Sequence, residues 1–187
     1  MARANPSPGR QLLQQWARWS RLPFGKRLFS WAVGRTAPYT GSVGGQFLEV
    51  RAGFARVRLH DRRAVRNHLA SVHAVALVNL AEMTSGVALM TALPAGVRGI
   101  VTGLSIEYLK KARGTLIATT TANAPIVVAE TITHDVTATI VDAAGDTVAT
   151  CVVHWRLSPP VDAAAPSSAA RTSAERSAQQ PAVTASA

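Results

Sequence analysis

The sequence predicts an α+β fold in which a long buried helix is wrapped by an antiparallel sheet of five to six strands, with a helical extension at the N-terminus. Residues 72–93 are apolar on all sides of a helix of about six turns, which is typical of a helix buried all round. Consecutive segments rich in Val, Ile and Thr follow this helix. Strands that follow one another without helices between them favour an antiparallel sheet over a doubly wound one.

The chain of 187 residues divides into four parts by composition. We expect a flexible leader over residues 1–10, amphipathic helices over 11–40, the folded domain over 41–158 and a disordered tail over 159–187. The tail is rich in Ala, Ser and Pro and has no apolar periodicity, which is typical of disorder. A chain of this length can bury one good core, so we expect one domain.

Two short helices are predicted within residues 11–35. Their apolar residues recur at helical spacing: Leu12, Trp16 and Trp19 in the first helix, and Phe24, Leu28, Trp31 and Ala32 in the second, which begins near Pro23. We expect this apolar face to pack on the domain or to cover a ligand channel. Because Arg and Lys side chains accompany the Trp residues, weak contact with a membrane surface is the alternative.

The strands are predicted from alternation and from turn signals. Residues 46–60 predict a hairpin whose turn lies at Ala52-Gly53. Further strands are expected over residues 98–109, 114–123, 127–141 and 147–157, separated by turns at Arg113-Gly114, Ala124-Pro125 and Gly145-Asp146. Ser71 is a candidate N-cap of the long helix.

The net charge of +10 is concentrated in the N-terminal part of the chain. Residues 1–70 hold 13 Lys and Arg against 2 acidic residues, whereas residues 71–187 hold 7 against 8. Such a basic region can serve nucleic acid, an anionic membrane or a phosphorylated ligand, or it is simply a solvated surface. Aromatic residues make up only 5% of the chain, and no stacking motif or zinc-finger spacing occurs. We therefore expect no nucleic-acid partner.

Several other classes are disfavoured. The sequence has no stretch of about 18 uninterrupted apolar residues and no signal-peptide pattern, so we expect a cytoplasmic protein. Cys151 is the single cysteine and is expected to be a buried apolar side chain. The absence of GxSxG, HExxH and paired Cys/His spacing argues against serine hydrolase chemistry and against a metal site. His134 and His154 lie singly in predicted strands and are expected to face solvent or core.

Glu82 is the one acidic residue within the predicted helix. An unpaired carboxylate in an apolar interior is costly, so a residue of this kind is rarely idle. We interpret Glu82 as a catalytic or ligand-orienting residue. The alternative is that it pairs with a basic group across a subunit interface.

Asn67 precedes Glu82 by fifteen residues, and His73 precedes it by nine. This pattern resembles the hotdog-fold thioesterases of the PaaI-like branch, in which an Asn, a His-Gly at the mouth of the central helix and an acidic residue nine positions later build an acyl-thioester site. The segment VTGLSIEYLKKA, from Val101 onward, resembles the strand that follows the helix in that family. The likeness covers about residues 40–157. Ala74 replaces the usual Gly, which keeps the backbone N–H and narrows the approach of the substrate.

The resemblance implies a hotdog fold and hydrolysis of an acyl-CoA or acyl-carrier thioester, as in fatty acid metabolism, by a homodimer or a dimer of dimers whose site forms between two copies. No cofactor is implied beyond the coenzyme A of the substrate. Glu82 would activate water or attack the carbonyl, Asn67 would fix the carbonyl or the water, and His73 would orient the loop. The Ala74 N–H would stabilise the oxyanion.

The residues expected to bind the substrate are His68, Arg62, Arg63, Arg66, Thr102, Ser105, Lys110, Lys111 and Arg113. The basic side chains among them would attract the phosphates of coenzyme A or an acidic carrier protein. Two other functions stay open. A non-catalytic acyl-thioester binding module would use Glu82 and Asn67 only to hold the head group. A hotdog hydratase or dehydratase would pair His68 with Glu82, although its HFPG element reads HLAS here.

Overall fold

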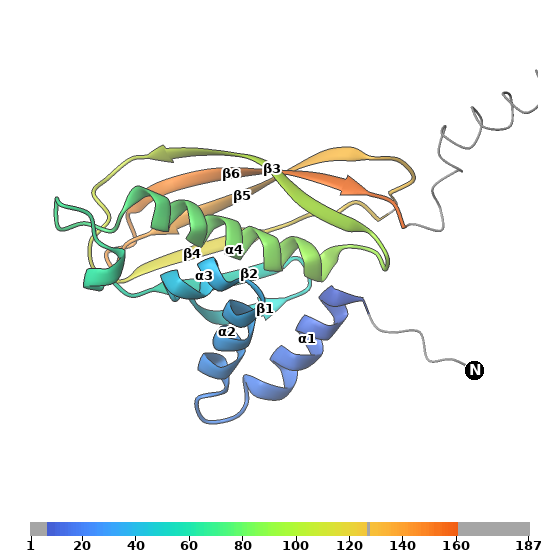
Figure 1. Ribbon diagram of the computed structural model, residues 1–187, viewed down its shortest axis with the longest axis horizontal. Coiled ribbons are helices and arrows are strands. Elements are labelled where there is room, and N and C mark those ends of the chain that lie inside the picture. The colour runs from blue at the N-terminus through green and yellow to red at the C-terminus, as the bar shows by residue number, and fades with distance from the viewer. Residues whose placement is uncertain (1–6, 127, 161–187) are drawn as a thin grey trace, which may run out of the picture.

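A computed structural model describes residues 7–126 and 128–160 of the chain. One antiparallel sheet has the strand order β1-β2-β4-β5-β6-β3, and the long helix α4 lies across it (Figure 1). The strands are β1 (Gln46–Arg51), β2 (Phe54–Leu59), β3 (Arg98–Tyr108), β4 (Leu116–Thr121), β5 (Ile132–Val141) and β6 (Thr147–Ser158). The helices are α1 (Pro8–Trp19), α2 (Gly25–Thr36), α3 (Pro38–Val43), the 3₁₀ helix η1 (Arg63–Val65) and α4 (Ala74–Ala92). Residues 1–6 of the expected leader and 161–187 of the expected tail lie outside the described residues.

Helix α4 is the predicted central helix, and the predicted α+β class is confirmed. By length and composition α4 could cross a membrane, but 72% of this apolar span is buried within the fold, where it serves as the core of the domain. The N-cap differs from the prediction. His73 caps the helix because its Nδ1 accepts a hydrogen bond of 3.1 Å from the Val75 N–H. Ser71 instead donates its hydroxyl to Asn67.

The predicted hairpin is confirmed, since Arg51 of β1 lies opposite Phe54 of β2 and the turn is therefore Ala52-Gly53. Gly53 has a φ of +72°, a conformation that glycine adopts without strain. The later strands follow the predicted order. Strand β5 begins at Ile132 rather than at residue 127, which itself lies outside the described residues.

The two edges of the sheet differ. Helix α2 covers the edge at β1, where the Phe47 N–H donates to Ser30 Oγ at 2.9 Å and Lys26 Nζ donates to the Leu48 carbonyl at 2.8 Å. Strand β3 forms the other edge and pairs only with β6 among the described residues. Its exposed side chains include Ile100, Leu104 and Tyr108. One edge is thus closed by the chain's own side chains, and the other is open.

The N-terminal helices form a hairpin below the sheet (Figure 1). The apolar face of α1 packs on the core as expected, through residues such as Leu12 and Trp16. The expectation for α2 was wrong. Its fully buried side chain is Phe29, whose ring meets Trp16 edge to face at a centroid distance of 5.1 Å. Because Phe29 sets the rotation of α2, Leu28 and Trp31 point to solvent. Helix α3 was not predicted.

Candidate functional site

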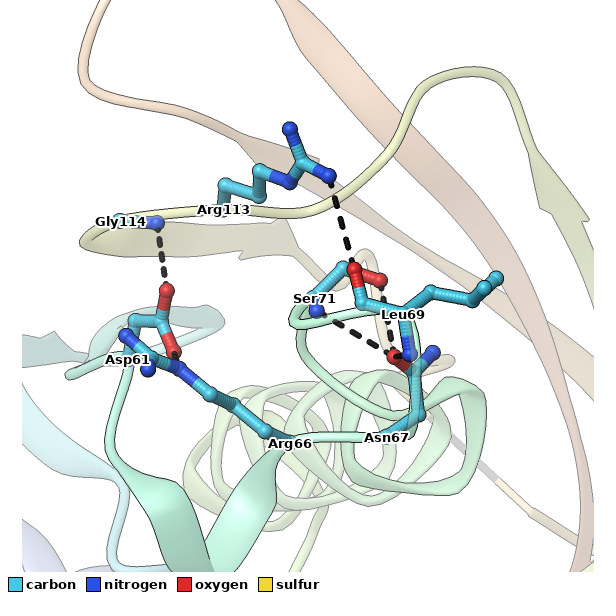
Figure 2. A network of polar contacts seen from close by, with 7 residues as sticks. All are labelled: Asp61, Arg66, Asn67, Leu69, Ser71, Arg113 and Gly114. Carbon is cyan, nitrogen blue, oxygen red and sulfur yellow. Dashed lines mark hydrogen bonds and ion pairs between the residues drawn. The ribbon is translucent and has the colours of Figure 1, made fainter.

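The loop that leads into α4 is organised by Asn67 (Figure 2). Its side-chain oxygen accepts hydrogen bonds from the Leu69 N–H at 2.9 Å, the Ser71 N–H at 3.2 Å and the Ser71 hydroxyl at 3.1 Å. The tight turn also places Ala70 at a φ of +53°. The Asn67 oxygen is therefore occupied within the loop, and only its amide nitrogen remains to face a ligand.

Asp61 forms an ion pair within this loop and accepts a hydrogen bond that fastens the loop to the neighbouring β3–β4 connection (Figure 2). Arg66 Nε donates to Asp61 Oδ1 at 2.6 Å, and the Gly114 N–H donates to Asp61 Oδ2 at 2.9 Å. The hydrogen bond from Arg66 holds the pKa of the Asp61 carboxyl below its usual value, against the opposing effect of burial. A backbone bond from Val72 to Ala112 adds a second tie. The entrance of α4 is therefore held from two sides.

His73 and Ala74 lie at the first turn of α4, as the sequence predicted. The His73 N–H donates to the Val65 carbonyl at 2.8 Å, and its Nδ1 is used as the helix cap, so its Nε2 is the remaining ring nitrogen. Ala74 is exposed, and within the described part of the chain its N–H has no acceptor. Free amides and the helix dipole favour negative charge at this point. The Ala74 N–H is thus available to an oxyanion.

Glu82 is half-buried and is the single ionisable residue of α4. Its carboxylate has no ion pair or hydrogen bond among the described residues. Burial, followed by the charge of Glu82, raises the pKa of the Cys151 thiol on β6, so the carboxylate lies close to the inner face of that strand. A buried, protonated thiol agrees with the apolar role predicted for Cys151.

Ala74 and Glu82 are too far apart to act together within one chain. They are separated by eight residues, or roughly 12 Å of α-helix. A thioester carbonyl needs a hydrogen-bond donor at about 3 Å and an attacking group at a similar distance. Within one copy of the chain the two groups therefore do not reach the same carbonyl.

Four of the predicted phosphate-binding side chains have partners within the chain. Arg66 pairs with Asp61, as described above. Lys110 Nζ lies between the carboxylates of Asp142 and Asp146, at 2.7 and 2.6 Å. Arg62 donates to two carbonyls at the end of α3, at 2.7 and 3.0 Å. Arg113 Nη2 donates to the Leu69 carbonyl at 3.5 Å. The other predicted residues of these clusters are exposed: Arg63, His68 and Lys111.

Ser105 belongs to a group of polar residues that the sequence did not reveal. His154 Nε2 lies 3.0 Å from Ser105 Oγ, and His154 Nδ1 lies 2.8 Å from Asp135 Oδ1. This is the order of contacts in a Ser-His-Asp triad. The three residues come from β3, β6 and β5, so only the strand register brings them together. Thr102 also joins this group, since its hydroxyl donates to the His154 carbonyl at 3.2 Å.

This polar group lies on the side of the sheet that faces away from α4. On β6 the neighbours of His154, Val153 and Trp155, are buried, and side chains alternate between the two faces of a strand. Asp135 is 54% exposed in the ion pair with His154. Ser105 is therefore not brought to Glu82, contrary to the grouping expected from the sequence.

Residues 25–157 match the family described as "Domain of unknown function (DUF4442)". Among solved structures, the structural-genomics protein APC5556 is 31% identical, with a TM-score of 0.68 over 80% of this chain and 97% of that one. PA5026 from Pseudomonas aeruginosa, described as a probable thioesterase, is 19% identical, with a TM-score of 0.64 over 73% and 96%. The thioesterase HI1161 from Haemophilus influenzae is 13% identical, with a TM-score of 0.57 over 66% and 84%. No protein with a curated functional description matches this chain.

The likeness to PA5026 and HI1161 concerns the fold. A six-stranded antiparallel sheet with a long central helix is the arrangement that the resemblance to hotdog thioesterases implied, so that resemblance is confirmed at the level of the fold. The family match spans the whole sheet and α4. The chain belongs to the DUF4442 family and has the hotdog fold.

Proposed function

We propose that the protein is an acyl thioesterase that hydrolyses an acyl-CoA or acyl-carrier thioester, with Glu82 as its catalytic carboxylate. The observation that carries this proposal is the position of Glu82, half-buried in an apolar helix and without a partner among the described residues. A carboxylate in such a place costs stability, and that cost is typical of a group kept for a ligand.

The proposed enzyme is a homodimer joined through the open edge at β3. Strand β3 carries exposed apolar side chains, and Val75 at the start of α4 is also exposed. Pairing two β3 strands would bury these side chains and satisfy the free backbone groups of the edge. Because 12 Å or so of helix separates Ala74 from Glu82 in one chain, we assign the oxyanion donor to one copy and the carboxylate to the other.

The chemistry requires one water and no cofactor. Glu82 takes a proton from water as the water attacks the carbonyl carbon, or attacks that carbon directly to form an anhydride that water then opens. The Ala74 N–H donates to the oxyanion, and the amide nitrogen of Asn67 is placed to position the water or the carbonyl. The carbon–sulfur bond breaks, the sulfur takes the proton, and the products are a carboxylic acid and a free thiol.

The test is thiol release from a panel of acyl-CoA substrates. We expect the Glu82→Gln variant to lose about 10²-fold or more in kcat, the usual contribution of a positioned base. Glu130→Gln, which alters an exposed carboxylate outside the strands, is the matched control and should keep full activity. Unchanged thiol release in Glu82→Gln would sink the proposal. Binding without release by the parent would favour the binding module, and conversion of a 3-hydroxyacyl to an enoyl thioester would favour the dehydratase.

A second candidate rests on the Ser105–His154–Asp135 contacts, whose order is that of a serine hydrolase. Against it, Asp135 is largely exposed, and water weakens the electrostatic contribution of such a group. Ser105→Ala distinguishes the two chemistries. We expect it to keep thiol release. Loss in Ser105→Ala together with retention in Glu82→Gln would move the reaction to the outer face of the sheet.

A further inference from the structure

The outward face of α2 has no packing partner within the described chain. Arg27, Leu28, Trp31 and Arg35 recur at helical spacing and therefore lie on one side of α2, and Phe24 precedes them as the N-cap of that helix. Phe24 is 76% exposed and Trp31 is 62% exposed. We call these five residues, with Leu22 of the preceding loop, the hairpin face. Exposed apolar side chains that gather on one face mark an interaction surface.

The tip of the hairpin face is strained as well as exposed. Phe24 has a φ of +61°, in the left-handed region that costs a non-glycine residue roughly 1 kcal/mol or more. Phe24 is the N-cap of α2. The loop between α1 and α2 forms the end of the hairpin that projects from the sheet (Figure 1). The Arg27 guanidinium carbon lies 5.8 Å from the centroid of the Phe24 ring, in a cation–π contact. An exposed aromatic held in this conformation favours a functional role for the tip.

The charge around this face has one sign. Residues 1–48 contain seven Lys and Arg and no acidic residue. Within the described residues Arg27 and Arg35 form no ion pair, and Arg35 stacks on Trp31 at 5.7 Å. The hairpin face is therefore a set of apolar side chains interleaved with unneutralised guanidinium groups.

A cavity of about 760 Å³ opens beside this face, between α2, α3 and Met83 of α4. Arg27, Arg35 and His60 line it, and no acidic residue does. Two of its polar lining residues, Gln46 and Thr40, accept hydrogen bonds from side chains outside the lining. Arg58 donates to Gln46 at 2.7 Å, and Asn79, which is buried, donates to Thr40 at 3.1 Å.

The lining therefore offers positive charge to a ligand without a competing carboxylate. With basic residues at the mouth and no acid in the lining, the cavity suits an anionic head group.

The chemistry of the face distinguishes between partners. A second copy of the same face would bring Arg against Arg, and like charges repel across an interface. Nucleic acid would bind the Arg side chains and could stack on the aromatic rings. It would leave the exposed aliphatic side chains of Leu22 and Leu28 without a partner. Aromatic and aliphatic side chains among Arg and Lys are the pattern of an interfacial membrane anchor.

We propose that the hairpin face docks on a bilayer that contains anionic phospholipids. Phe24, Leu28 and Trp31 enter the interface, and Arg27 and Arg35 hold a lipid phosphate at the mouth of the cavity. This assignment is independent of the thioester chemistry, because none of these residues belongs to the loop or helix face that carries Asn67, Ala74 and Glu82.

The test is co-sedimentation of the full chain with vesicles of phosphatidylcholine alone and with about 30% phosphatidylglycerol. We expect binding only to the mixed vesicles, weakening as salt rises. The variants Phe24→Ser with Trp31→Ser, and Arg27→Gln with Arg35→Gln, should each lose at least about tenfold in vesicle binding. Ile126→Ser and Arg98→Gln change exposed residues elsewhere and should bind as the parent does. No binding, equal binding to both vesicles or binding that survives both double substitutions overturns the proposal.

Fluorescence gives a second readout that does not depend on sedimentation. Brominated phosphatidylglycerol should quench tryptophan emission, and the quenching should be lost in Trp31→Phe although three of the four tryptophans remain. Quenching that persists in Trp31→Phe contradicts the docking orientation. If Phe24→Ser with Trp31→Ser instead lowers the oligomeric mass in solution, the face is a contact between protein chains and the membrane assignment is wrong.

Discussion

Ala74 contributes to the proposed site through its backbone alone. It is the first residue of α4 and its N–H has no acceptor in the described chain, so its methyl group matters less than its amide. Proline is tolerated at the first position of a helix, where its missing N–H breaks no internal bond. His73, which precedes it, already has a φ of −64° and a ψ of 141°, a conformation that suits a residue before proline.

Ala74→Pro therefore removes the oxyanion donor without disturbing the helix. We expect a loss of about 10²–10³-fold in kcat for thiol release, the usual effect of deleting one such donor. Thermal unfolding should be nearly unchanged. Ala74→Gly keeps the N–H and is the matched control. Equal activity in the two variants would show that the amide does not bind the oxyanion.

Asp61 gives a prediction on pH. Its pKa is lowered in the folded protein by the bond from Arg66, so its contribution to stability is present above the unfolded pKa of about 3.9 and is lost as the pH falls below that value. Asp61→Asn should lower the midpoint of thermal unfolding by roughly 2–4 °C at pH 7. The difference from the parent should shrink steadily as the pH is lowered from the unfolded pKa through the lower folded pKa. A difference that stays constant to acid pH would mean that the charge of Asp61 contributes nothing.

The sequence can propose individual site residues where their spacing along the chain is informative. Glu82, Asn67 and His73 were proposed because the family pattern is local in sequence, and the Ala74 amide followed from it; their roles stay predictions. The helix cap was predicted wrongly, because Ser71 and His73 can both serve as caps. The choice depends on Asn67, which accepts a hydrogen bond from the Ser71 hydroxyl. The Asp61–Arg66 and Ser105–His154–Asp135 contacts depend on loop and strand geometry that no local pattern encodes.

Helix α1 is seated directly on the end of α4. A Cβ built on Gly9 would lie 1.9 Å from the Met90 carbonyl oxygen, a backbone atom that cannot move aside by itself. In an isolated helix Ala is more stable than Gly by about 1 kcal/mol. Here Gly9→Ala should destabilise the protein by about 1–3 kcal/mol instead, because α1 must shift.

The measurement is chemical or thermal unfolding of Gly9→Ala beside Gln15→Ala, an exposed position of the same helix. The control should be neutral or slightly stabilising. If Gly9→Ala matches the control, α1 does not pack on α4 as the structure places it.

Elements with a strong pattern were predicted well, and those without one were not. Helix α4 and the β1–β2 hairpin follow from an apolar run and from alternation around a Gly turn. Helix α3 was missed because its six residues, PYTGSV, have no apolar periodicity. The rotation of α2 was wrong because the sequence offers two apolar faces. Phe29 is the buried one because its ring fits between Trp16 and Phe47, a contact between separate elements.

At the level of the assembly, the division of the site between two copies can be tested by mixing. Glu82→Gln and Ala74→Pro homodimers should each be inactive, since each lacks one half of every site. Exchange of subunits forms heterodimers in which one of the two sites keeps both groups. Random exchange should therefore restore about a quarter of the parent's activity, since half of the dimers are mixed. Thiol release before and after subunit exchange measures this.

No recovery after exchange that mass spectrometry confirms would place both groups in the same copy, or would remove one of them from the reaction. A mixture of Glu82→Gln with itself under the same treatment controls for reactivation by the procedure. The readout needs no assumption about the acyl chain, because any substrate that the parent hydrolyses can be used.

The cover on β1 by Ser30 and Lys26 has a consequence for growth of the sheet. A sheet with two open edges can add copies at both ends and continue into a fibre. Here α2 engages two of the backbone groups that another strand would need at β1, the Phe47 N–H and the Leu48 carbonyl. An added strand would have to displace both side chains, which disfavours growth of the sheet at this edge. A chain that is joined only at its other edge stops at a closed pair.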